Sequence, residues 1–196
     1  MGLGKQAKTL SKNQIDTALA YISNGRYPIR DKVIFLLSVK AGLRAMEIAN
    51  IKWEMILTPN GEIGHSIHLT NVASKGRSGG RIIPLNKELR SAITDLRVSG
   101  PLGRPSPFLI TTERSISTTA QVIVNLFTRL YINLGFTGCS SHSGRRTFIT
   151  NAARKISTVG GSLRDIQMLA GHSNLTTTQR YIEGDGEAQQ KIVQLV

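Results

Sequence analysis

The sequence contains a single cysteine, Cys139, in 196 residues. No intrachain disulfide can form, and neither thiol chemistry nor a cysteine-based zinc finger has support. Long hydrophobic stretches are also missing, since no apolar run approaches the roughly 20 residues that a membrane-spanning helix needs. Residues 1–10 lack the apolar segment of a secretory signal. We therefore expect neither a membrane span nor export.

Acidic residues are scarce relative to basic ones. Lys and Arg number 25 against 12 Asp and Glu, which gives a formal net charge of +13 and a pI of about 10.5. So large an excess favours a polyanionic partner, either nucleic acid or an anionic membrane surface. A generically basic protein with no such partner is the alternative that charge alone leaves open.

The length fits one well-cored domain with a small appendage, but not two large domains. Residues 1–10 are basic and unpatterned, which predicts a flexible basic arm. The loop at 100–107 is rich in Gly and Pro but too short to argue for separate domains. Ala188, Ile192 and Leu195 share one helical face and predict a C-terminal helix within residues 186–196.

Apolar periodicity predicts helices on both sides of a central β region. Ser11-Lys12-Asn13-Gln14 has the form of a capping box at the start of a helix, and Pro28 breaks the chain after it. Residues 33–39 are apolar almost all round, so a buried helix is expected there, ending near Gly42. Further helices are expected over residues 86–98, 119–135, 145–156 and 163–170.

The central region has the period of strands. Apolar and polar residues alternate over 63–70, residues 81–84 form a returning strand, and residues 53–57 are expected to add a third. The predicted fold class is mainly α with a small antiparallel β-sheet.

Six side chains suited to phosphodiester chemistry follow one another along the chain: Arg44, Lys75, His142, Arg145, His172 and Tyr181. A tyrosine oxygen forms a stable phosphotyrosine, but its pKa near 10 means that it needs a proton acceptor and a positive field. Arginine supplies that field, since its planar fork binds two phosphate oxygens at once. In this interpretation His142 accepts the tyrosine proton, His172 adds a third donor and Lys75 protonates the leaving 5′-oxygen.

Each of these residues alone has a simpler explanation. Arg44 and Glu47 stand at i and i+3, which is the spacing of a surface ion pair. Lys75 beside Arg77 is by default a solvated basic loop, and Tyr181 alone is more often a packed aromatic. Only the ordered set favours catalysis over these separate explanations.

Other motifs do not predict a site. His65 and His68 have a His-x-x-His spacing, but on a strand they face opposite sides, so a shared metal is not expected. The glycine-rich segment 76–80 lacks the Lys-Ser/Thr ending and the following helix of a phosphate-binding loop.

Four segments resemble the conserved boxes of the tyrosine recombinases, the phage integrase family. They are Ala41-Gly42-Leu43-Arg44-Ala45-Met46-Glu47-Ile48, Ser74-Lys75 with Arg81-Ile82-Ile83-Pro84-Leu85, His142-Ser143-Gly144-Arg145-Arg146-Thr147, and the run from Leu169 to Tyr181. The resemblance covers roughly residues 10–185 and implies the fold of DNA breaking-rejoining enzymes, with a catalytic domain over 11–185. Gly144 departs from the pattern, because members commonly have Leu in this place.

The resemblance also implies roles for individual residues. The six side chains listed above would be catalytic, with Tyr181 as the nucleophile, and Glu47 would be the acidic companion of Arg44. Contacts to DNA are implied for Arg77, Arg81 and Arg146.

The implied function is site-specific recombination of the integrase or invertase type through a 3′-phosphotyrosine, with no cofactor and no metal. Expected partners are duplex DNA, further copies of the chain in a tetramer on paired sites and accessory DNA-bending proteins, but no membrane. Residues 186–196 would contact a neighbouring protomer. The sequence has no segment that resembles the separate N-terminal helical domain of typical members. We therefore expect either a short member, such as the invertases that switch fimbrial promoters, or a catalytic fragment of a longer protein. A cytoplasmic location of bacterial or phage origin is expected. Alternatives are DNA relaxation of the type IB topoisomerase kind and a non-catalytic basic DNA-binding protein.

Overall fold

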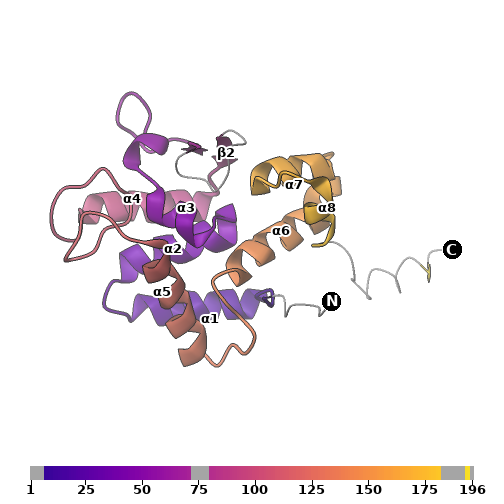
Figure 1. Cartoon of the computed structure of the whole chain (residues 1–196), viewed down its shortest axis with the longest axis horizontal. Coiled ribbons are helices and arrows are strands. Elements are labelled where there is room, and N and C mark those ends of the chain that lie inside the picture. The colour runs from indigo at the N-terminus through magenta and orange to yellow at the C-terminus, as the bar shows by residue number, and fades with distance from the viewer. Residues whose placement is uncertain (1–6, 72–79, 182–192, 195–196) are drawn as a thin grey trace. The chain divides into compact units, whose positions relative to one another are not determined.

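The computed structural model describes residues 7–71, 80–181 and 193–194 (Figure 1). Within these ranges the chain is mainly helical with one two-stranded antiparallel sheet, so the predicted fold class is confirmed. The elements in chain order are α1 (Lys12–Ser23), α2 (Pro28–Ala41), α3 (Ala45–Asn50), the 3-10 helix η1 (Trp53–Met55), β1 (Ser66–Leu69), β2 (Arg81–Pro84), α4 (Lys87–Ser99), α5 (Ala120–Asn133), α6 (Ser143–Lys155), the 3-10 helix η2 (Ile156–Val159), α7 (Leu163–Ala170) and α8 (Leu175–Gln179).

Internal contacts divide the chain into two compact units, a first unit of Met1–Phe148 and a second unit of Ile149–Val196. In the first unit α2 packs against α1, α3 and α4, and α3 packs against α5; in the second unit α7 packs against α8. The predicted domain limits at residues 10/11 and 185/186 stay predictions. The expected C-terminal helix falls on residues that lie largely outside the described ranges.

Helix α2 is the centre of the first unit. Its residues 33–39 are all buried, as their apolar sequence predicts. Pro28 does more than break the chain, since it occupies the first turn of α2, where its missing N–H costs no hydrogen bond. Gly42 ends the helix in the left-handed conformation at φ 65°, which a residue with a Cβ rarely adopts. The chain therefore turns sharply just before Arg44.

Side-chain caps set most of the other helix starts. The capping box predicted at α1 is confirmed, because Gln14 N–H donates to Ser11 Oγ at 3.2 Å and Ser11 N–H donates to Gln14 Oε1 at 2.9 Å. At α4 and α5 the side chains of Asn86 and Thr119 accept the backbone N–H groups of Leu89 and Val122. The helices expected over 86–98, 119–135, 145–156 and 163–170 are confirmed as α4, α5, α6 and α7.

The sheet pairs β1 with β2 in antiparallel register, with Ile67 opposite Ile83 and Leu69 opposite Arg81. The third strand expected at 53–57 is wrong, since Trp53–Met55 is a 3-10 helix and the N–H of Ile56 turns back to the carbonyl of Trp53 at 2.9 Å. The physical reason is that Met55 and Ile56 are adjacent in sequence and are both buried. A strand would point them to opposite faces.

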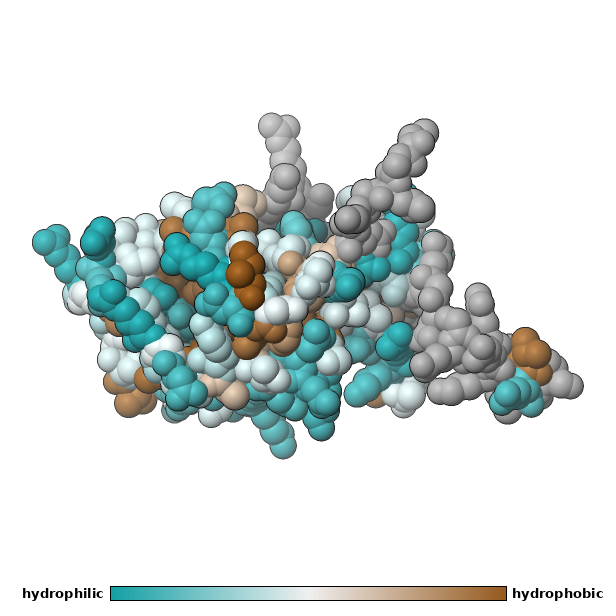
Figure 2. Space-filling view, turned by 90° about the horizontal axis from the view of Figure 1, so that it is seen from below, coloured by the Kyte–Doolittle hydropathy of each residue, from teal (hydrophilic) through white to brown (hydrophobic). Residues whose placement is uncertain are grey.

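The surface carries no large apolar area on the face seen in Figure 2, where hydrophobic side chains form small groups among hydrophilic ones. In the part of the chain that the structure describes, no helix is long and apolar enough to cross a bilayer.

Replacing Phe35 tests the central role of α2. Phe35 is fully buried and its ring lies 6.5 Å from that of Phe127 on α5. We expect Phe35→Ala to lower the free energy of unfolding by about 3–5 kcal/mol, because it removes buried area and leaves a cavity. Ile132→Ala is the control: Ile132 on α5 is 70% exposed, so its loss should change stability by less than about 0.5 kcal/mol. Urea unfolding measures both, and equal effects would contradict the assignment of α2 as the core.

Candidate functional site

Arg44 and Glu47 form a local pair at the start of α3. Arg44 stands just before the helix in an extended conformation, and the Glu47 side chain turns back toward it. Glu47 Oε2 accepts the backbone N–H of Arg44 at 2.8 Å, and Oε1 accepts Nη1 of Arg44 at 3.0 Å. The simple explanation of a surface ion pair fails on one point, because the Glu47 side chain is fully buried while that of Arg44 is 28% exposed.

Arg81 on β2 binds the same carboxylate. Its Nη1 donates to Glu47 Oε1 at 2.8 Å and its Nη2 donates to Oε2 at 2.9 Å, so the contact is bidentate. Burial alone would raise the pKa of the Glu47 carboxyl, but the hydrogen bonds and charge of Arg81, followed by the N–H and charge of Arg44, lower it below its ordinary value. Glu47 is therefore ionised at neutral pH.

Sequence reasoning missed this contact, since 34 residues separate its partners. A DNA contact was predicted for Arg81, whose side chain is only 11% exposed. The structure places its guanidinium fork on Glu47, and a DNA contact by Arg81 stays a prediction.

Arg145 lies in the first turn of α6 and is 4% exposed. Its Nη1 donates to the carbonyl of Gly42 at 2.5 Å. Gly42 stands two residues before Arg44, so both arginines predicted to bind one phosphate are held at the same turn of the first unit. Arg44 and Arg81 share the single carboxylate of Glu47, so these three side chains leave an excess of positive charge.

Two glycines allow α6 to approach α2 closely. A Cβ on Gly144 would lie 2.9 Å from Ser38 Cβ and 3.0 Å from Val39 Cγ1, and a Cβ on Gly42 would lie 3.0 Å from Phe148 Cε1. Real Cβ atoms rarely come this near to other atoms. A Leu at position 144 would overlap α2 in this chain. The close approach is what lets Arg145 reach the carbonyl of Gly42.

His142 directly precedes α6 and is exposed. Its backbone N–H donates to Ser140 Oγ at 3.3 Å, and its carbonyl accepts the N–H of Arg146 at 2.9 Å. These contacts fix the backbone of His142 and leave its ring at the surface. Arg146 is half-buried, and its contact with DNA stays a prediction.

In the second unit the structure brings His172 and Tyr181 together. Gly171 ends α7 in the left-handed conformation, and His172 follows it. Nδ1 of His172 lies 2.9 Å from Oγ1 of Thr178, which is fully buried on α8. The rings of His172 and Tyr181 stack at 5.6 Å between centroids and 17° between planes. Thr178 was not singled out from the sequence, where it is one of three consecutive threonines with no signal of its own.

Lys75 and Arg77 lie outside the described residues, so their predicted roles stay predictions. The strands on either side are described, and they pair as far as Leu69 and Arg81.

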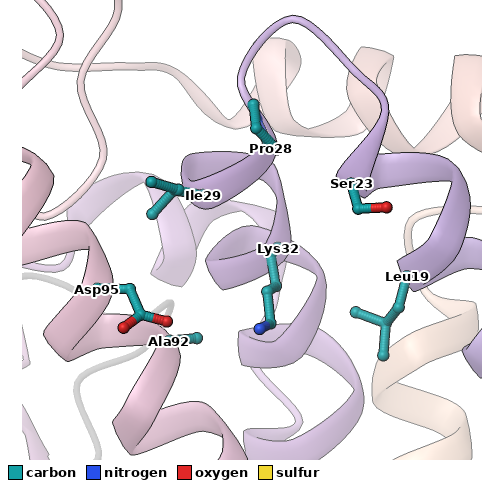
Figure 3. Close-up of a pocket in the computed structure, with 7 residues that line it drawn as sticks. All are labelled: Leu19, Ser23, Pro28, Ile29, Lys32, Ala92 and Asp95. Carbon is teal, nitrogen blue, oxygen red and sulfur yellow. The ribbon is translucent and has the colours of Figure 1, made fainter.

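Two surface pockets contain none of the predicted site residues. One, of about 120 Å³, lies between α1, α2 and α4, with Lys32 and Asp95 as its charged side chains (Figure 3). The other, of about 360 Å³, is lined by Trp53, Phe108 and the loop that follows α4. Among the described residues, no group of three or more His, Cys, Asp or Glu side chains could hold a metal ion. The pockets thus give no support to a small-molecule substrate at the predicted site.

The close packing of α6 on α2 can be tested at Gly144. We expect Gly144→Ala to destabilise the protein by about 1–3 kcal/mol, because the added methyl group overpacks the contact with Ser38. Ser38→Ala should offset part of this loss, since it removes the atom nearest to the new methyl group and a buried hydroxyl that has no partner among the described residues. A double-mutant cycle by urea unfolding measures the coupling. Strict additivity of the two changes would contradict the packing argument.

Known proteins resemble this chain in sequence. The sequence matches the phage integrase family over residues 8–187. Tyrosine recombinase XerA of Pyrococcus horikoshii is 28% identical over 183 residues, which cover 89% of this chain and 56% of that protein. Tyrosine recombinase XerD of Pseudomonas aeruginosa is 30% identical over 190 residues, which cover 91% of this chain and 58% of that protein. The chain thus spans just over half the length of the curated relatives it matches.

A solved integrase structure shares the fold of this chain. The Tn1549 transposon integrase, solved in complex with circular intermediate DNA, aligns with a TM-score of 0.70 at 23% identity, covering 100% of this chain and 68% of that one. The described helices and the two-stranded sheet are therefore those of a tyrosine recombinase catalytic domain. With a family match that spans nearly the whole sequence, the chain belongs to the phage integrase family.

Proposed function

We propose that this chain is the catalytic domain of a site-specific DNA recombinase, of the integrase or invertase type, that cleaves and rejoins duplex DNA through a 3′-phosphotyrosine. The observation that carries the proposal is the pairing within each unit: Arg44 and Arg145 at one turn of the first, and the stacked His172 and Tyr181 in the second. Structural ion pairs and packed aromatics would not produce both groups in this order along the chain.

The reaction follows from the roles of these groups. The Tyr181 oxygen attacks phosphorus and forms the new O–P bond, while its proton passes to His142. Arg44, Arg145 and His172 stabilise the charge that grows on the non-bridging oxygens. The bond from phosphorus to the 5′-oxygen breaks, and Lys75 gives the proton that this oxygen needs. The energy of the broken bond is kept in the phosphotyrosine, so the reverse reaction rejoins the strands without a nucleotide or a metal.

The partners belong to the same proposal. A net charge of +13 suits duplex DNA, and the related Tn1549 integrase was solved on DNA. Strand exchange between two sites needs several protomers, for which we propose a tetramer on paired sites. Residues 186–196 would reach a neighbouring protomer, and accessory proteins would bend the DNA. The activity would take place in the cytoplasm of a bacterial or phage-infected cell, which the similarity to XerD of Pseudomonas aeruginosa supports.

Replacement of Tyr181 tests the function directly. A nicked duplex that carries the cognate site should trap a covalent adduct with the wild-type chain, and peptide mapping should place the phosphate on Tyr181. Tyr181→Phe should bind the duplex with unchanged affinity and form no adduct, because only the attacking oxygen is lost. An adduct on another residue would refute the nucleophile. DNA binding with no adduct under any condition would favour a non-catalytic DNA-binding protein, and relaxation of supercoiled DNA by a monomer would favour a topoisomerase.

A sulfur substrate tests Lys75 as the acid. Arg145→Ala should slow cleavage by at least about 10²-fold, in line with the loss of one oxyanion donor, and Lys75→Ala by at least about 10²-fold, in line with the loss of a general acid. Replacing the leaving 5′-oxygen by sulfur removes the need for a proton, so it should restore cleavage by Lys75→Ala. Arg145→Ala is the matched control and should stay slow on the same substrate, since its defect lies in charge stabilisation. A Lys75 defect that sulfur leaves unchanged would make Lys75 a phosphate contact.

A further inference from the structure

The carboxylate of Glu47 has no capacity left for another donor. Oε1 accepts Nη1 of Arg44 and Nη1 of Arg81, and Oε2 accepts the backbone N–H of Arg44 and Nη2 of Arg81. Two hydrogen bonds on each oxygen satisfy a fully buried carboxylate. Glu47 is therefore a fixed connector between α3 and β2.

The charges of this group do not cancel. Glu47 is ionised, so one negative charge faces the two positive charges of Arg44 and Arg81. Without Arg81, a buried carboxylate would face Arg44 alone, and the pair would be electrically neutral. With Arg81 present, the three side chains together carry one net positive charge.

The two arginines present different parts of their guanidinium groups. Arg81 directs both Nη atoms at Glu47, whereas Arg44 commits only Nη1. Nε and Nη2 of Arg44 make no hydrogen bond within the described residues, and the side chain is 28% exposed. Arg44 can thus meet a phosphate with two N–H groups while it holds Glu47 with a third.

We propose that Arg81 is a positioning residue. Its charge balances that of Glu47, so Glu47 does not neutralise the charge of Arg44, and Nε and Nη2 of Arg44 stay available for the scissile phosphate. Arg81 itself does not contact DNA, which replaces the role that the sequence predicted for it. This inference rests on the proposed function, since it assigns Arg44 to the phosphate. Arg81 also ties β2, which follows the segment containing Lys75, to the start of α3.

The salt dependence of DNA binding separates the two roles of Arg81. Each phosphate contact adds about 0.9 to the slope of log affinity against log salt concentration. We expect Arg81→Gln to keep the slope of the wild-type chain and to slow adduct formation on Tyr181 by up to about 10²-fold, because a reacting group is displaced. Arg26→Gln is the matched control: it removes the same charge from an exposed pair with Glu113 and should leave the rate of adduct formation unchanged. A slope reduced by about 0.9 in Arg81→Gln alone would make Arg81 a DNA contact and overturn the inference.

A second substitution tests the charge argument. In Arg81→Gln the ionised Glu47 cancels the charge of Arg44, so the further change Glu47→Gln should restore adduct formation by at least about tenfold, within the effect expected of a repositioned group. All variants are compared at a temperature at which circular dichroism shows them folded. If Arg81→Gln acted only through lost packing, the further change Glu47→Gln would not restore the rate of adduct formation. A double variant as slow as Arg81→Gln, or slower, would therefore overturn the inference.

Urea unfolding of the variants without DNA tests the link between Glu47 and Arg81 separately from the proposed function. If the wild-type chain forms no adduct, the proposed function fails, yet the link between Glu47 and Arg81 still predicts stabilities. Removing one partner of a buried pair leaves an uncompensated charge, whereas removing both does not. The double variant should therefore have a higher urea midpoint than Arg81→Gln alone. A lower midpoint for the double variant would show that Arg81 does not balance Glu47.

Discussion

The buried carboxylate of Glu47 is the contact on which the first unit's candidate site depends. Burying a carboxylate costs several kcal/mol unless hydrogen bonds and opposite charge compensate, and here four donors from α3 and β2 do so. The two positive charges of Arg44 and Arg81 exceed the single negative charge of Glu47. Because two arginines share one carboxylate, the contact that connects two distant segments also leaves positive charge at Arg44, where the proposed chemistry needs it.

The position of Arg145 depends on the close packing of α6 on α2. Gly42 and Gly144 remove the side chains that would hold α6 away from α2, and Arg145 then reaches the carbonyl of Gly42. The close contact has a cost, since it leaves the hydroxyl of Ser38 buried with no partner among the described residues. A stability penalty at this place is what one expects if the location of Arg145 matters more than the best packing of α2.

The sequence predicts the long elements because they carry their own signals. The capping box at Ser11 and the glycines at 42 and 171 mark helix ends that the structure confirms. Helices α3, α8 and η1 have three to six residues, too few to show a period. At the site, the order of motifs predicts which residues to consider, and one of their contacts, between Arg44 and Glu47, is local. The pairing of Arg81 with Glu47 and the support of His172 by Thr178 arise only when the chain folds, so no pattern in the sequence marks them.

The stacking of Tyr181 on His172 is a weak contact that orients the two rings. A pair of stacked rings contributes about 0.5–1.5 kcal/mol, and a barrier raised by about 1.4 kcal/mol slows a reaction about tenfold. The loss of the stacking energy alone would thus correspond to a factor of up to about ten in rate. The hydrogen bond between Nδ1 of His172 and Oγ1 of Thr178 is a separate contact that holds the His172 ring. In the second unit His172 therefore has a contact with Thr178 beside its stack with Tyr181, the residue that we propose as the nucleophile.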